Sequence, residues 1–332
     1  MRRGLCGVAS CGLMLAIPAA AHGDGLPVQG VDAGPTGVAS ATVRYVTLPA
    51  RPGSTLVAQV RRHGGQVLRS RLLHGSFTIP AVAYDGSPSG LSADARTLAL
   101  IRPRAHFPQR RTRIVVLDAK RLRVSNRLTL RGDFSFDALS PDGRTMYLIE
   151  YRSRRDPTRY AVRAYDLARG RLLRAPIVDP REPGERMRGL PVTRETSGDG
   201  RWAYTLYDGA GSHPFVHALD TARGEAACID LDALTGFRRM YELRLRSSGR
   251  ELSVLDGATV VATIDRATFR VAAPAASSPP AVAAAVVERR RLVGSAGDRR
   301  RAAAGAACDG GPHGAAVTGL DVVMLDSPRV KP

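Results

Sequence analysis

Lysine and asparagine are almost missing from this 332-residue chain, which has only Lys120, Lys331 and Asn126. Its 49 Lys and Arg residues are therefore nearly all arginine, and against 30 Asp and Glu residues they give a net charge of +19. Together with abundant Ala and Gly, this is typical of a high-GC coding bias. The charge still creates a field that favours anionic partners such as acidic polysaccharide or anionic lipid.

Aromatic residues are also scarce, at 5% of the chain. No stretch interleaves arginine with aromatic residues in the way that a base-stacking surface requires. A specific nucleic acid is therefore not expected as a partner.

Catalytic and cofactor motifs are missing as well. There is no phosphate-binding loop or dinucleotide fingerprint, and "GSPSG" at residues 86–90 has Pro88 where a nucleophile would stand. His213 and His217 are four residues apart, which on a strand separates them by ~13 Å. His63, His74 and His106 have no ligand spacing. We predict no catalytic residue, metal site or cofactor.

The N-terminus has the pattern of a secretory signal. Two arginines precede an apolar run over residues 4–20, and small residues stand before His22. This predicts a signal peptide over residues 1–21 and a secreted, periplasmic or cell-envelope protein. A short membrane anchor is the alternative, but the run falls below the ~20 residues that span a bilayer. "VASC", ending at Cys11, has the shape of a lipoprotein box after a very short apolar stretch, so a lipoprotein is not expected.

Cysteine is rare too, and signal cleavage would leave only Cys228 and Cys308. An even pair in an oxidising compartment favours one disulfide, and two free thiols are the alternative. Neither cysteine lies in a C-x-x-C motif or beside a histidine, so metal ligation and thiol catalysis are not predicted.

What the chain does contain is a recurring polar turn, most clearly "LSPDGRTMYL" at residues 139–148, with related stretches from Leu91, Thr196 and Arg246. In S-x-D-G-R the Asp caps backbone N–H groups and the Gly takes a positive φ, which suits a tight reversal. A second turn follows each copy, at Asp118, Asp166, Asp220 and Asp265.

Short segments with the alternation of β-strands lie between these turns, and no helical periodicity appears over residues 43–271. Successive copies are 48 residues (Asp94 to Asp142) and 57 residues (Asp142 to Asp199) apart. Such spacings are close to the ~40 to 50 residues of a four-stranded propeller blade. An earlier unit lies over residues 43–73. The pattern predicts an all-β fold, a β-propeller.

Two stretches also resemble a known group. "RYVTLPARPGSTLVAQVRRHGGQVL", residues 44–68, is similar to a repeat of the YVTN-type secreted propellers. "LSPDGRTMYL" resembles the turn shared by YVTN-type, WD-repeat-like and Tol-Pal-type periplasmic propellers. The resemblance covers residues 43–271 and implies fold rather than function, because such propellers serve as binding platforms, lactonases and peptidase gates alike. It has departures: Ala95 follows Asp94, and no Asp precedes Gly249.

We expect five blades of four antiparallel strands over residues 42–272. The first unit supplies only three strands, and a closed ring needs one more. "LDVVMLD", within residues 318–326, is predicted to supply that innermost strand; an open ring with a loose tail is the alternative. The remaining segments are a linker over residues 22–41, an Ala/Pro/Arg-rich and largely disordered linker over residues 273–317, and a low-complexity C-terminal tail over residues 327–332.

Propeller geometry gathers arginines on the face opposite the S-x-D-G turns, where they suit bidentate contact with carboxylate, phosphate or sulfate. The candidate binding residues are Arg102, Arg104, Arg110, Arg111, Arg152, Arg154, Arg155, Arg186 and Arg188. Arg181, Arg238 and Arg239 lie in similar loops, with Asp156, Glu182 and Glu185 nearby. An ordinary solvated set of loops is the alternative.

The sequence therefore predicts an exported, non-catalytic propeller that binds a protein or an anionic cell-envelope polymer, with no transmembrane helix after signal cleavage. The alternative is a lactonase-like or hydrolytic propeller that uses channel carboxylates, for which Asp85, Asp137 and Glu195 are the candidates. A degenerate propeller without a ligand is a third possibility.

Overall fold

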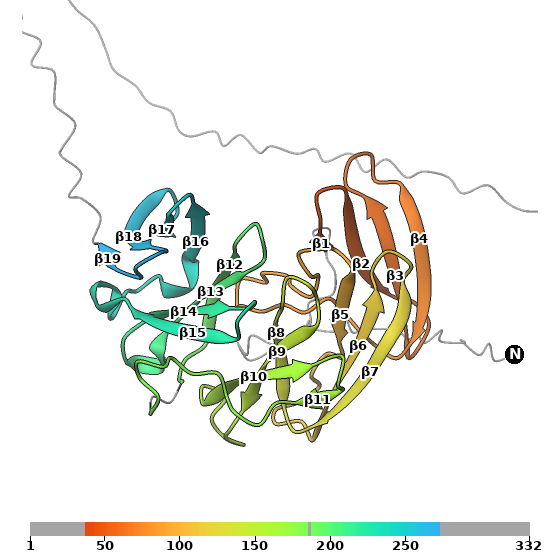
Figure 1. Ribbon diagram of the computed structural model, residues 1–332, viewed down its shortest axis with the longest axis horizontal. Coiled ribbons are helices and arrows are strands. Elements are labelled where there is room, and N and C mark those ends of the chain that lie inside the picture. Colours follow the sequence, from red (N-terminus) through yellow and green to blue (C-terminus); the bar gives the residue numbers. More distant parts are fainter. Residues whose placement is uncertain (1–36, 185–186, 273–332) are drawn as a thin grey trace, which may run out of the picture. The chain divides into compact units, whose positions relative to one another are not determined.

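The computed structural model describes residues 37–184 and 187–272, which form strands joined by turns and short loops (Figure 1). The helices of this part are single 3-10 turns: η1 (Gly209–Gly211), η2 (Asp232–Leu234) and η3 (Met240–Glu242). No helix within the described residues is long and apolar enough to cross a membrane. The predicted signal peptide, residues 1–21, and the predicted linker, closing strand and tail, residues 273–332, lie outside the described residues.

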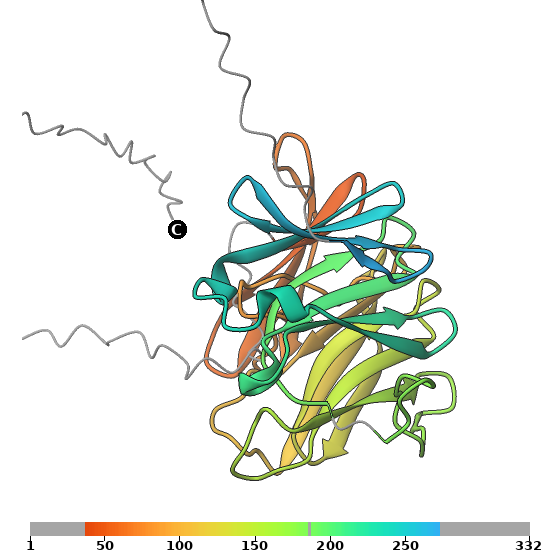
Figure 2. The ribbon, with the colours of Figure 1, turned by 90° about the vertical axis from the view of Figure 1, so that its left-hand side faces the viewer.

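The strands of the described residues form five antiparallel sheets in chain order, which follow one another as blades 1 to 5 of a β-propeller (Figures 1 and 2). Blade 1 consists of β1 (Val38–Ala39), β2 (Val43–Pro49), β3 (Ser54–Arg61) and β4 (Val67–His74). Blade 2 consists of β5 (Thr97–Ile101), β6 (Arg111–Asp118) and β7 (Arg123–Arg131). Blade 3 consists of β8 (Phe134–Leu139), β9 (Thr145–Tyr151), β10 (Tyr160–Asp166) and β11 (Arg171–Leu172). Blade 4 consists of β12 (Pro191–Thr196), β13 (Trp202–Tyr207), β14 (Phe215–Asp220) and β15 (Glu225–Asp230). Blade 5 consists of β16 (Leu243–Ser248), β17 (Glu251–Asp256), β18 (Thr259–Asp265) and β19 (Val271–Ala272).

The innermost strand is irregular in two of the blades, blade 1 and blade 2. In blade 2, a single bridge from Leu91 to Leu98 stands where the other blades have a first strand. In blade 1 the innermost position belongs to the two-residue strand β1, which pairs with β2. β1 lies within residues 22–41, where the sequence predicts a linker, and takes the position expected for residues 318–326. The innermost position of blade 1 therefore belongs to β1, and residues 318–326 themselves lie outside the described residues.

Strand alternation builds the core, because successive side chains point toward the two neighbouring blades. In β6, Ile114 and Val116 pack against blade 3, whereas Val115 and Leu117 pack against blade 1. An apolar cluster of this kind fills the space between each pair of consecutive blades in the described residues.

The structure confirms the predicted Ser–Asp turns. In blade 3, Ser140 Oγ donates to Asp142 Oδ1 at 2.6 Å, and the same oxygen accepts from the Arg144 N–H at 3.0 Å. Gly143 has a φ of +68°, as a tight reversal requires. The equivalent pairs in blades 2 and 4 are Ser92–Asp94 and Ser197–Asp199.

Turn geometry prevails over residue identity where the two conflict. Ala95 occupies the glycine position in blade 2 and has a φ of +54°, although a left-handed conformation costs an alanine about 1–2 kcal/mol. In the second turns, the carboxylates cap N–H groups three residues on. The positions four residues after those Asp residues all have positive φ: Leu122, Gly170, Gly224 and Phe269.

A hairpin over residues 80–90, between β4 and β5, reaches across the centre toward β12 (Figure 1). Its two arms pair through the Ala81–Pro88 bridge. At its tip, the Tyr84 N–H donates to the Pro191 carbonyl oxygen at 2.9 Å. The chain thus links the first blades to blade 4 through the middle of the fold.

The same tip also reaches blade 5. The rings of Tyr84 and Tyr241 have their centroids 4.8 Å apart, and Asp85 Oδ2 lies 3.7 Å from Arg244 Nε. Blade 5 is therefore held to the first blades by side chains of the hairpin.

Candidate functional site

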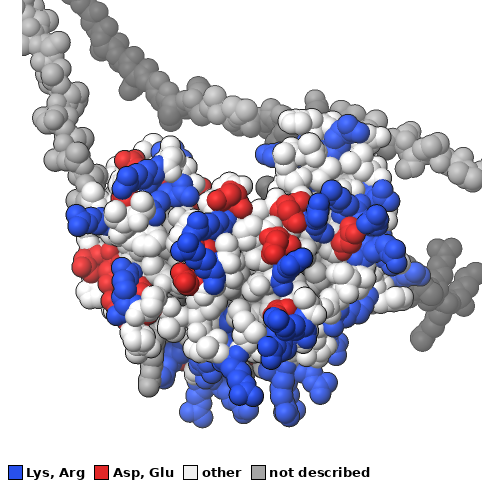
Figure 3. Space-filling model, viewed as in Figure 1, with Lys and Arg blue, Asp and Glu red and all other residues white. Residues whose placement is uncertain are grey.

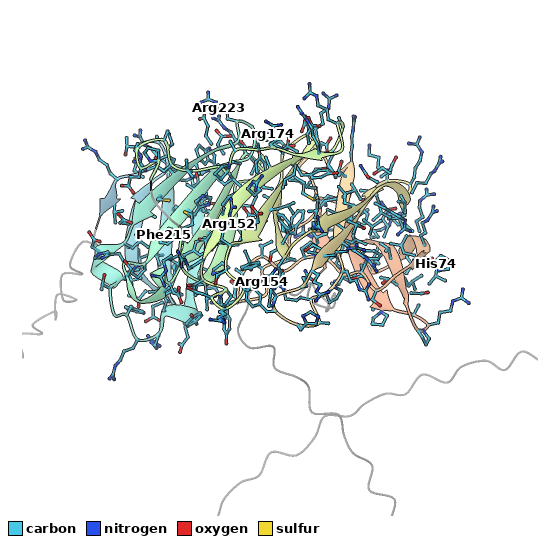
Figure 4. The ribbon with its side chains drawn as sticks, turned by 90° about the horizontal axis from the view of Figure 1, so that it is seen from below. His74, Arg152, Arg154, Arg174, Phe215 and Arg223 are labelled. Atoms are coloured by element: carbon cyan, nitrogen blue, oxygen red, sulfur yellow. The ribbon has the colours of Figure 1, made fainter. Side chains whose placement is uncertain are left out.

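The connections of each blade alternate between two faces, because consecutive strands are antiparallel. The Ser–Asp turns and the second Asp turns share one face, here called the turn face. The loops between second and third strands, and those that lead to the next blade, share the other, the loop face. Figure 4 shows the two faces edge-on, with Arg223 of a second Asp turn at the upper edge and Arg154 at the lower edge.

On the turn face, arginines lie beside aspartates. Figure 3 looks onto this face and shows acidic side chains interspersed among the basic ones. The pairs include Arg144–Asp142 at 3.8 Å and Arg169–Asp166 at 2.9 Å. The Arg169 N–H groups hold the pKa of the Asp166 carboxyl below its usual range. At these turns the positive charge is thus balanced by a neighbouring carboxylate.

The predicted arginines of blade 2 lie on the loop face without such partners. Arg102, Arg110 and Arg111 are exposed. None of them lies within 4 Å of a carboxylate oxygen of the described residues. Their guanidinium groups are thus available to an external anion.

Arg104 is different, and its place in the predicted site needs correction. Its side chain is 2% exposed and pairs with Asp133 at 2.5 Å, while its guanidinium carbon lies 4.9 Å from the ring centroid of Tyr151. Burying an arginine requires such a partner. Arg104 therefore joins the β5–β6 loop to the start of blade 3 and is buried rather than exposed on the loop face.

The arginines of blade 3 form a mixed group. Arg154 and Arg155 are exposed and have no carboxylate within 4 Å in the described part of the chain. Arg152 lies 3.4 Å from Glu150, and Arg188 lies 3.7 Å from Asp156. Arg186 lies outside the described residues. A hollow of about 420 Å³ adjoins this group and is lined in part by Arg152, Arg159 and Met187.

Two of the other loop arginines are held by acids. Arg239 and Arg238 are both exposed, but only Arg239 pairs with a carboxylate of the described residues, that of Asp256. Arg181 pairs with Asp179 at 2.5 Å. Burial of Asp179 opposes its ionisation, but hydrogen bonds from Arg181 and the Cys228 N–H outweigh it and lower the pKa of Asp179.

Cys228, one of the two cysteines expected to form a disulfide, lies on β15 and is partly buried. Its Sγ is 3.7 Å from Met187 Sδ. Cys308 lies outside the described residues, so the predicted pairing remains a prediction.

The three channel carboxylates are engaged in contacts between blades rather than gathered at one site. Asp137 of β8 pairs with Arg194 of β12, and both side chains are 4% exposed. Glu195 Oε1 accepts from the Ser247 N–H of blade 5 at 3.1 Å. Asp85 belongs to the central hairpin described above. These carboxylates link blades and do not converge on a common reacting position.

His217 lies on β14, in the buried layer next to Asp137 and Arg194. Burial lowers the pKa of His217 to about 4, against the opposing effect of the Asp137 carboxylate. Its Nε2 has no hydrogen-bond partner among the described residues. His213 is instead exposed, with Nδ1 3.1 Å from Asp232 Oδ1. Among the described residues, no three His, Cys, Asp or Glu side chains form a metal-binding group.

A cavity of about 510 Å³ lies at the centre of the propeller, between the Ser–Asp turns and the central hairpin. Its lining includes Ser92, Ser197, Arg62 and Arg194. The two serine hydroxyls serve their own turns, and Arg194 is bound to Asp137. Sequence reasoning missed Arg194 and the hairpin, and only the Pro- and Gly-rich stretch at residues 80–90 marks the hairpin in the sequence.

No protein-family model matches this chain, and no curated protein sequence matches it. Solved structures similar in fold include hydrazine synthase of Kuenenia stuttgartiensis, with 13% identity, a TM-score of 0.39 and coverage of 69% of this chain and 66% of that one. TolB of Acinetobacter baumannii has 15% identity and a TM-score of 0.37, over 70% of this chain and 52% of that one. A puromycin hydrolase has 16% identity and a TM-score of 0.39, over 72% and 39%. The chain thus spans about two thirds, half and two fifths of these proteins.

Proposed function

We propose that this chain is an exported, non-catalytic propeller that binds an anionic cell-envelope polymer through arginines of its loop face. One observation carries the proposal: a set of arginines there is exposed and has no acidic partner in the described residues, namely Arg102, Arg110, Arg111, Arg154 and Arg155. An external anion binds a guanidinium group most readily where no carboxylate already holds it.

The distribution of charge along the chain supports this proposal. Residues 38–131, blades 1 and 2, contain 17 Lys and Arg but only three Asp and no Glu. Residues 191–272, blades 4 and 5, contain 10 Arg against 11 Asp and Glu. A coding bias acts on the whole chain and does not explain why acidic residues are depleted in two blades alone. A one-sided field of this kind attracts polyanions.

The state of the channel carboxylates favours binding over hydrolysis. Catalytic carboxylates need to reach a substrate atom within hydrogen-bonding distance. Asp137 and Glu195 instead bind Arg194 and Ser247 of neighbouring blades. The hydrolase alternative therefore has less support than the binding module.

Export and the YVTN-type or WD-repeat-like type of the repeats are part of the same proposal, and both rest on the sequence. Mass spectrometry of the N-terminus of the protein isolated from its native cells tests export. The expected mature chain begins at His22, whereas an intact N-terminus on cytoplasmic protein contradicts it.

Binding is tested with the full mature chain and three probes: a purified anionic cell-wall polymer, anionic lipid vesicles and DNA. Saturable binding to the wall polymer at physiological salt is expected. Replacing Arg110, Arg111 and Arg154 together by Ala is expected to weaken it about tenfold or more, because each guanidinium contributes charge-assisted hydrogen bonds.

A charge-matched control separates a site from a general field. Arg96, Arg144 and Arg169 are exposed on the turn face beside Asp residues, and their replacement by Ala removes the same three charges. This control is expected to bind within about twofold of the parent chain. Equal weakening by both triple variants, or binding to all three probes that salt abolishes, contradicts a loop-face site.

A further inference from the structure

A pocket of about 210 Å³ opens between blades 1 and 2 on the loop face. Blade 2 contributes Arg102, Arg113 and Arg127 to its wall, and blade 1 contributes His74, which lies at the right in Figure 4. Among the described residues, no Asp or Glu lines the pocket, and the three guanidinium groups have no ion pair. The pocket therefore concentrates positive charge without an internal counter-charge.

Strand alternation brings the arginines to one wall. On β6, Arg113 lies on the same side of the sheet as Val115, which packs against blade 1. Arg127 of β7 is the register partner of Val115, and the Arg102 N–H donates to the Arg113 carbonyl oxygen at 2.9 Å. Between blades 1 and 2, the apolar cluster therefore ends toward the loop face, and arginines line the wall beyond it.

The blade 1 side of the pocket is held in place by Thr55. Its hydroxyl accepts from the Phe77 N–H at 2.8 Å and donates to the Gly75 carbonyl oxygen at 2.9 Å. Gly75 has a φ of +105°, and a Cβ there would lie 2.5 Å from the Phe77 ring. Glycine is thus required for Phe77 to line the pocket, and a preorganised wall reduces the cost of binding.

The lining defines the chemistry of the ligand. Arginine stays charged at all ordinary pH values and matches phosphate oxygens with paired N–H donors. Three such groups and an imidazole suit the three or more oxygens of a phosphate group better than the two of a carboxylate. Phe77, on the blade 1 side, supplies apolar surface beside them. We propose that this pocket binds the phosphate group of an organic phosphate ester with an apolar or aromatic body.

Isothermal titration calorimetry of the full mature chain with phenyl phosphate tests the site. Saturable binding is expected, and Arg113→Ala and Arg127→Ala are each expected to weaken it about tenfold or more, since each removes charge-assisted hydrogen bonds. Arg123→Ala is the matched control: Arg123 is exposed on the same strand as Arg127 but does not line the pocket. It is expected to bind within about twofold of the parent.

Several results overturn the proposal: no saturation up to ~10 mM phenyl phosphate, equal weakening by Arg123→Ala and Arg127→Ala, or benzoate binding as tightly as phenyl phosphate. Vesicles of phosphatidic acid identify the source of the phosphate. Binding to them that depends on Arg127 supports a lipid headgroup, whereas binding of phenyl phosphate alone supports a small soluble ester.

This site does not depend on polymer binding. Arg110, Arg111 and Arg154 are outside the pocket lining, so their triple replacement is expected to leave the affinity for phenyl phosphate within about twofold. The two proposals can therefore fail separately.

Discussion

Arginine has different surroundings in the two halves of this propeller. In blades 4 and 5 it joins strands, as in the pairs Arg201–Asp220 and Arg250–Asp265, which link neighbouring strands of one blade. In blades 1 and 2 most arginines have no acid to bind. Arg113 and Arg127 even share one pocket wall.

The difference shows that arginine content alone does not reveal a function. An arginine beside a carboxylate satisfies a structural need, and its charge is cancelled locally. An arginine without one adds to the external field and repels its neighbours, which is an energetic cost to the folded state. An anionic ligand would therefore stabilise the protein most where it binds arginines that have no neighbouring carboxylate. Substitutions of paired, buried and unpaired side chains test this contrast.

The largest effect is expected at the buried pair between blades 3 and 4. Asp137→Ala leaves the Arg194 guanidinium buried without its carboxylate, and removing one partner of a buried pair costs about 3–5 kcal/mol. Chemical denaturation should show this loss in the free energy of unfolding. Glu225→Ala removes the same charge from an exposed position of blade 4 and is expected to change stability by at most about 0.5 kcal/mol. Similar losses in both variants contradict a structural role for the pair.

A pH-dependent effect is expected at His217, in the same buried layer. Its pKa of about 4 in the folded protein lies below the ordinary value near 6.5, so the unfolded chain binds a proton first as the pH falls. The neutral, buried His217 therefore contributes to the free energy of unfolding in full above about pH 6.5. This contribution, roughly 3 kcal/mol, is lost as the pH falls toward 4. His217→Phe removes this term. The stability difference between parent and variant, measured at pH 7.5 and pH 4.5, should shift in favour of the variant at the lower pH; a constant difference contradicts a buried neutral imidazole.

Local features of the fold were predictable from the sequence. The Ser140–Asp142 turn closes within a few residues, so its hydrogen bonds depend only on the residues that the motif contains. Strand alternation likewise follows from period-two patterning. Together with the 48- and 57-residue spacing of the copies, these signals predicted the propeller fold and its five blades.

Long-range contacts were not predictable in the same way. Arg104 and Arg102 look alike in the sequence, and only Asp133, 29 residues further on, explains why Arg104 is buried. β1 has two residues, too few for a pattern. The tip of the central hairpin binds Pro191, more than 100 residues away. Burial and pairing of this kind depend on the assembled blades, so single-sequence reasoning included Arg104 in the site and missed the Arg113–Arg127 pocket.

The smallest effect on stability is expected from the unpaired arginines themselves. Here the test is whether the free energy of unfolding rises or falls, more than by how much. Replacing Arg123 and Arg131 of β7 by Gln removes repulsion without breaking an ion pair of the described residues, so the free energy of unfolding should stay equal or rise by up to about 0.5 kcal/mol. Arg201→Gln in blade 4 should lower it, because Asp220, with a side chain 2% exposed, loses its cation. The free energy of unfolding of both variants is measured by denaturation at low and at high salt. Because salt screens repulsion, added salt should stabilise the parent more than the Arg123/Arg131 variant. If the Arg123/Arg131 variant is less stable than the parent, repulsion among the arginines of blades 1 and 2 does not lower the stability of the fold.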